Sequence, residues 1–135
     1  MNNKKVKTND DFLSICGLDV PHGIAMTGGK ESGYIAVLSM FCKDAENRLP
    51  LLQTQPSPDS LTSFVIQVHA LKSASYSIGA AKLSALAEDL LSAGKTRDFE
   101  VIQDKLPTFA EQLIELVNNI KSALKGSREQ GSNEQ

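Results

Sequence analysis

The chain contains no tryptophan, and aromatic side chains make up only 5% of its 135 residues. Proteins that bind single-stranded nucleic acid use aromatic side chains as stacking platforms, and such side chains are scarce here. The charge balance also argues against nucleic acid, because 14 basic and 16 acidic residues give a net charge of −2. A nucleic-acid surface needs a positively charged stripe, and the sequence has none. We therefore expect no nucleic-acid partner.

Long apolar runs are missing as well. The longest run is a few residues, whereas a helix that spans a bilayer needs about 20 apolar residues in succession. The charged start Met1–Lys5 is followed by polar residues and not by the apolar stretch of a signal peptide. We therefore expect a cytoplasmic protein with no direct membrane contact, or the cytoplasmic part of a larger membrane protein.

Cysteine is rare, with Cys16 and Cys42 as its two occurrences. Their wide separation suits a reducing compartment and predicts neither a disulfide framework nor a zinc site. Cys42 falls on an apolar helical stripe, so we expect it to be a core residue. The sequence Gly28-Gly29-Lys30 is far short of a phosphate-binding loop. We therefore expect no metal and no cofactor in this chain.

The residues that remain are arranged for helices, since apolar side chains recur at steps of three and four. This pattern predicts a short helix over 19–26, long helices over 31–52 and 60–78, a fourth that ends at 93–94, and a last one from 96 or 98 to 124. No segment alternates in the manner of a strand, and the connections are short. We predict an all-α fold: an antiparallel four-helix bundle with a short additional N-terminal helix.

Composition also predicts the domain limits. Residues 1–18 are polar and expected to be partly flexible, and residues 126–135 are rich in Gly, Ser, Gln and Glu and expected to form a disordered tail. Residues 19–125 are left as one domain, which is long enough for a single hydrophobic core. Within it, Ser57 or Asp59 is the expected N-cap of the third predicted helix, which covers residues 60–78.

That helix carries His69 at the edge of its buried stripe, about 100° around the helix from a centre near Val68. An imidazole is largely neutral near pH 7, which leaves one ring nitrogen free as a nucleophile. Lys72 lies one turn further on and can place a cation beside a phosphoryl group, while Ser73 is small enough to keep the approach open. On spacing alone, a surface histidine beside an ordinary lysine is the more common arrangement. The second histidine, His22, has no charged partner at helical spacing, and we expect it to be incidental.

The segment His69-Ala70-Leu71-Lys72-Ser73-Ala74-Ser75, followed by Ile78-Gly79-Ala80, resembles the signature of histidine-containing phosphotransfer (HPt) domains. The family pattern is His-x-Leu-Lys-Gly-x-Ser/Ala, with a Gly-Ala or similar pair that closes the helix. The likeness extends over about residues 19–124. Ser73 departs from it, because the family usually has glycine at that position.

The resemblance implies a phosphorelay intermediate in two-component signal transduction. His69 would accept a phosphoryl group from the aspartate of a receiver domain and pass it to the aspartate of another. The receiver would carry the magnesium ion, so no autonomous catalytic centre is expected here. We also expect a monomer, and a hybrid sensor histidine kinase is a further expected partner or parent protein. The alternative is a helical adaptor that binds a receiver or kinase without being phosphorylated.

Overall fold

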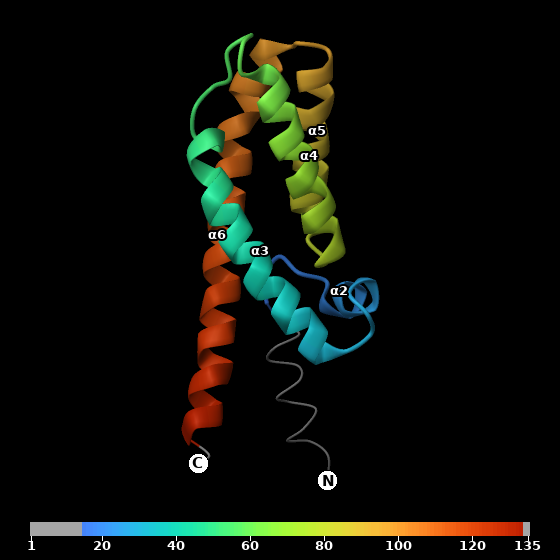
Figure 1. The fold of residues 1–135 in the computed structure, drawn as a ribbon, viewed down its shortest axis with the longest axis vertical. Helices are drawn as coiled ribbons and strands as arrows, with labels where there is room; N and C mark the ends of the chain where they lie inside the picture. Colours follow the sequence, from blue (N-terminus) through green and yellow to red (C-terminus); the bar gives the residue numbers. More distant parts are fainter. Residues whose placement is uncertain (1–14, 134–135) are drawn as a thin grey trace.

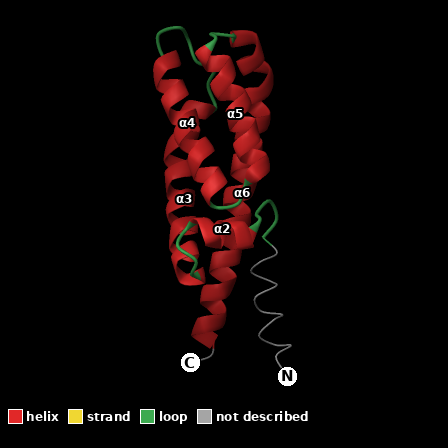
Figure 2. Ribbon diagram, turned by 90° about the vertical axis from the view of Figure 1, so that its right-hand side faces the viewer, coloured by secondary structure: helices red, strands yellow, loops and turns green. Residues whose placement is uncertain are grey.

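The computed structural model describes residues 15–133. Five helices follow one another along this part of the chain (Figures 1 and 2), and no strand occurs within it. They are α2 (Val20–Met26), α3 (Glu31–Leu52), α4 (Leu61–Ser77), α5 (Ala81–Lys95) and α6 (Phe99–Asn133). The predicted fold class, an all-α bundle of four helices with a short additional N-terminal helix, is thereby confirmed.

The four long helices bury one continuous apolar core. Helix α4 packs on α5, α5 packs on α6, and α6 lies along α3, while α2 crosses the end of the bundle beside α3 and α4 (Figure 1). Each fully buried aliphatic or aromatic side chain contributes about 1.5–3 kcal/mol through removal of apolar surface from water. The largest of these fully buried side chains include residues of every long helix: Tyr34, Leu38, Leu52, Phe64, Leu71, Leu90, Ile102, Phe109, Leu113 and Ile120.

The turn after α4 leads into α5 and is hydrogen-bonded to the start of α2. Gly79 has a φ of +93°, and the N–H of Ala80 donates back to the carbonyl of Ser75 at 2.8 Å, which closes the helix. The N–H of Asp19 donates to the carbonyl of Gly79 at 2.8 Å, and the Tyr34 hydroxyl donates to the carbonyl of Ile78 at 2.7 Å. The C-terminal end of α4 is therefore held by both α2 and α3.

Two local features differ from the sequence-based expectations. The N-cap of α4 is Ser60 and not Ser57 or Asp59, because the first helical residue is Leu61. The Ser60 hydroxyl does not cap the helix but accepts the N–H of Ser57 at 2.9 Å. At the other end of the chain, α6 extends to Asn133, beyond the end at 124 that periodicity predicted.

Among the described helices, none combines the length and the apolar character that a membrane span requires.

Candidate functional site

His69 lies on the outer face of α4. The residue before it, Val68, is fully buried together with Leu71 and Ser75, and these side chains define the inward stripe of the helix. His69 itself is exposed, and its ring has no hydrogen-bond or ion-pair partner among residues 15–133. Both ring nitrogens are thus open to a group that approaches from outside. The helical pattern predicted His69 at the edge of the buried stripe, and the structure places it on the exposed side of that edge.

Two large apolar side chains share this outer face of α4. Ile66 lies one turn before His69 and is 60% exposed, and Tyr76 lies two turns after it and is 50% exposed. Ser73 is also exposed and lies between His69 and Tyr76 on the same side of the helix. The histidine is thus flanked by apolar surface along the helix, with a small residue in between. Isolated exposed apolar residues are common, but here two of them flank one exposed histidine on a single face of α4.

Lys72 is engaged with α5. Its ammonium nitrogen lies 2.6 Å from Oε1 of Glu88, and its carbonyl oxygen accepts a hydrogen bond from the Ser84 hydroxyl at 3.1 Å. The hydrogen bond from Lys72 lowers the pKa of Glu88 below its usual value. Sequence reasoning did not find this pair, because Lys72 and Glu88 come together only when α4 and α5 pack. The expected contact between Lys72 and a phosphoryl group stays a prediction.

His22 lies at the α2 end of the bundle. Its ring contacts that of Tyr76 edge to face, with the ring centroids 5.0 Å apart. Its backbone N–H donates to Oδ1 of Asp19 at 3.2 Å, and that bond caps α2. The contact with Tyr76 gives His22 a packing role that helical spacing could not indicate, because the partner belongs to another helix.

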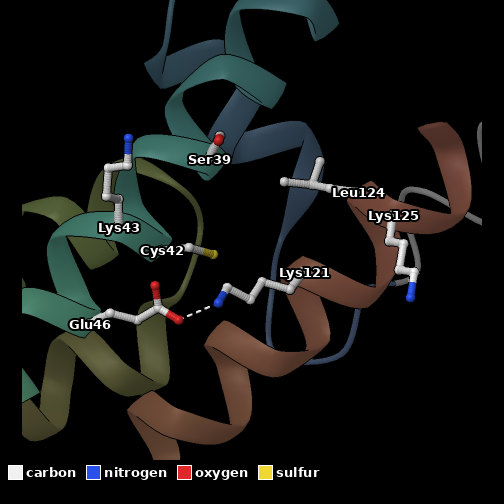
Figure 3. Close-up of a pocket in the computed structure, with 7 residues that line it drawn as sticks. All are labelled: Ser39, Cys42, Lys43, Glu46, Lys121, Leu124 and Lys125. Carbon is white, nitrogen blue, oxygen red and sulfur yellow. Dashed lines mark hydrogen bonds and ion pairs between the residues drawn. The ribbon is translucent and has the colours of Figure 1, made fainter.

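Cys42 lies between α3 and α6, at a pocket of about 510 Å³ (Figure 3). Its Sγ is 3.8 Å from the carbonyl oxygen of Val117, and burial raises the pKa of the thiol to about 11. The thiol therefore stays protonated near neutral pH, in agreement with the expected core position. Across the pocket, Lys121 is paired with Glu46. None of the lining residues belongs to α4: Ser39, Cys42, Lys43, Glu46, Lys121, Leu124 and Lys125.

Comparison with known protein families shows which family the chain belongs to. The family model described as the Hpt domain matches residues 36–123, which is more than half of the chain and includes all of α4 and α5. The chain belongs to the Hpt domain family. A search of curated proteins and a search of solved structures each found no match. The match confirms the resemblance seen in the sequence at the level of the family. Hpt domains act in phosphotransfer within two-component phosphorelays and interact with receiver domains.

Proposed function

We propose that this Hpt domain is a phosphorelay intermediate that accepts a phosphoryl group on His69 from one receiver aspartate and transfers it to another. The observation that carries the proposal is the exposed imidazole of His69 on α4, which lies inside the family match and has no hydrogen-bond or ion-pair partner among residues 15–133. It supports the proposal because the relay needs a nucleophile that a second protein can reach. We further propose that the domain works as a monomer in the cytoplasm.

The proposed transfer needs no other reacting group of this chain, because the bond formed and the bond broken account for all the electrons and protons. The lone pair of the unprotonated ring nitrogen of His69 attacks phosphorus, and the bond from phosphorus to the aspartyl oxygen breaks. The electron pair of that bond returns to the receiver carboxylate, while the second ring nitrogen of His69 keeps its proton. Onward transfer is the reverse reaction on a second receiver. The receiver brings the metal ion that offsets the charge on the moving group.

The surface around His69 fits such a partner. Ile66 and Tyr76 supply apolar contact on either side of the histidine, and the exposed Ser73 is small enough to leave the path to the ring open. We propose that the receiver docks over this face and that its aspartate approaches past Ser73. A docked receiver would also exclude water from the phosphoryl group during transfer.

In the proposed reaction Lys72 assists by offsetting charge on the phosphoryl oxygens. Because the metal ion of the receiver carries the larger share, Lys72→Ala should slow transfer by about 10- to 100-fold, which corresponds to about 1–3 kcal/mol of barrier. The far-ultraviolet circular dichroism spectrum should be unchanged, because Lys72 contributes only a partly exposed ion pair to the fold. Transfer at the wild-type rate would remove Lys72 from the mechanism.

The test is incubation with a panel of phosphorylated receivers, followed by mapping of the acid-labile phosphate by mass spectrometry. The expected result is label on His69 and none on His69→Gln. His22→Gln is the control, because it removes the other histidine and should be labelled like the wild type. Label on His22, or label that persists in His69→Gln, would overturn the assignment. Receiver binding without any phosphate transfer would support instead the non-phosphorylated adaptor, which could use the same exposed apolar side chains.

A further inference from the structure

Helix α5 holds Lys72 at two points. The Ser84 hydroxyl donates to the Lys72 carbonyl at 3.1 Å, and the Glu88 carboxylate lies 2.6 Å from the Lys72 ammonium. Ser84 and Glu88 are one turn apart on α5, so both face the same turn of α4. The position of Lys72 in the free domain is therefore set by α5 and not by its own helix alone.

Glu88 is itself held in place. Its second oxygen, Oε2, accepts a hydrogen bond from the Ser92 hydroxyl at 3.3 Å, one turn further along α5. The hydrogen bond from Lys72 lowers the Glu88 pKa, so the carboxylate is an anion near neutral pH. The ammonium of Lys72 thus rests against a fixed negative charge.

The same ammonium is within reach of His69. Residues three apart on a helix have their Cβ atoms about 5–6 Å apart, and a lysine side chain is long enough to turn toward that neighbour. The Lys72–Glu88 pair is partly exposed, at 37% and 48%, and exposed pairs are weak. A phosphoryl group carries about two negative charges, so it competes well against one carboxylate.

Resting on the proposed function, we propose that Glu88 is a positioning residue that shares Lys72 with the phosphoryl group on His69. The ammonium lies on Glu88 when His69 is free and moves to the phosphoryl oxygens when His69 is phosphorylated. Because leaving Glu88 has a cost, the phosphorylated domain is less favourable than it would be without that carboxylate. Glu88 thereby keeps the phosphoryl group from resting on His69 and favours its onward transfer.

The chain offers a matched control on the same helix. Asp89 is the next residue and pairs with Lys105 of α6 at 3.3 Å, with exposures of 42% and 49% that resemble those of the Lys72–Glu88 pair. Asp89→Asn therefore removes one negative charge and one surface ion pair, as Glu88→Gln does, but leaves Lys72 untouched. A difference between the two variants therefore reports the loss of the Glu88 contact with Lys72 and not the loss of one negative charge on α5.

The first measurement is the equilibrium ratio of phosphorylated domain to phosphorylated receiver. Glu88→Gln should raise this ratio about two- to five-fold, the range expected for a partly exposed ion pair, and Asp89→Asn should leave it unchanged. In a Lys72→Gln background, Glu88→Gln should no longer raise the ratio. An equal rise in Asp89→Asn, or the same rise when Lys72 is absent, would overturn the proposal.

The second measurement needs no receiver. The protein is phosphorylated with phosphoramidate, and the ¹⁵N resonance of the Lys72 ammonium is compared before and after modification of His69. We expect this resonance to move on phosphorylation and the Lys105 resonance to stay. A Lys72 resonance that does not move refutes the shared lysine. If the resonance moves while no receiver transfers phosphate to His69, the proposed function fails and the sharing of Lys72 stands.

Discussion

Gly79→Ala tests how the end of α4 is built. Gly79 has a φ of +93°, a backbone conformation that residues with a Cβ rarely adopt. A Cβ built on this residue would lie 2.2 Å from the carbonyl oxygen of Asp19, which is backbone and cannot rotate away. Either α2 moves away from α4, or the turn rearranges.

The expected loss of stability has separate parts. Left-handed backbone costs a residue other than glycine about 1–2 kcal/mol. The displacement of Asp19 also breaks its N–H bond to the Gly79 carbonyl, worth about 1 kcal/mol, and exposes part of Val20, whose full burial is worth about 1.5–3 kcal/mol. We expect Gly79→Ala to lower the free energy of unfolding by about 3–5 kcal/mol.

Gly28→Ala is the matched control. Gly28 also has a positive φ, +110°, but a Cβ there would have no atom within 4 Å. Its substitution should cost only the backbone strain of about 1–2 kcal/mol. Both variants also change the unfolded chain in the same way, so that contribution cancels in the comparison.

The assay is urea denaturation of the wild type and both variants, followed by circular dichroism. Gly79→Ala should unfold at a clearly lower urea concentration than Gly28→Ala. Equal midpoints at an equal slope would show that the close approach of Asp19 to Gly79 does not stabilise the fold, and the account of how α2 is held would be wrong.

Three further outcomes are expected. Ser75→Ala should raise the free energy of unfolding in urea by about 1 kcal/mol, because the fully buried hydroxyl has no hydrogen-bond partner among residues 15–133; a large loss would contradict this. Burial raises the pKa of Tyr34 to about 12, so the folded state keeps a proton that the unfolded chain releases, and stability should fall between about pH 10 and 12. Tyr34→Phe should lose that part of the pH dependence in thermal melts at several pH values. Ser73→Leu should fold yet fail in receiver phosphotransfer while Ser73→Ala stays active, and full activity of the leucine variant would rule out an approach past this residue.

Much of the fold could be predicted because helical periodicity follows directly from which side chains are apolar. The expected ranges 31–52 and 19–26 agree with α3 and α2 to within one residue. Helix ends were harder, since they depend on which polar group meets which backbone group. The hydroxyl of Ser60 binds the N–H of Ser57 instead of capping α4, and composition alone does not separate these two uses of serine.

In the candidate site, too, features of a single helix could be predicted and contacts between helices could not. The exposure of His69 and Ser73 follows from their angle to the buried stripe of one helix, and sequence is sufficient for that. The ion pair of Lys72 joins residues 16 positions apart on two helices, and the ring contact of His22 joins α2 to α4. Contacts of this kind depend on the rotation of each helix in the bundle, which a single sequence does not specify.

The contact between α4 and α5 also matters for how the proposed relay would work. The proposed nucleophile, His69, lies on an exposed face, and its ring has no hydrogen-bond or ion-pair partner among residues 15–133. What the bundle does control is the neighbouring cation, since α5 fixes Glu88 and Glu88 holds Lys72. A relay must not retain the phosphoryl group too tightly, and a lysine with two competing partners binds it less strongly than a free one. In the proposed relay, the packing of α5 on α4 would therefore tune how long the phosphoryl group stays on His69, and the receiver would supply the chemistry of each transfer.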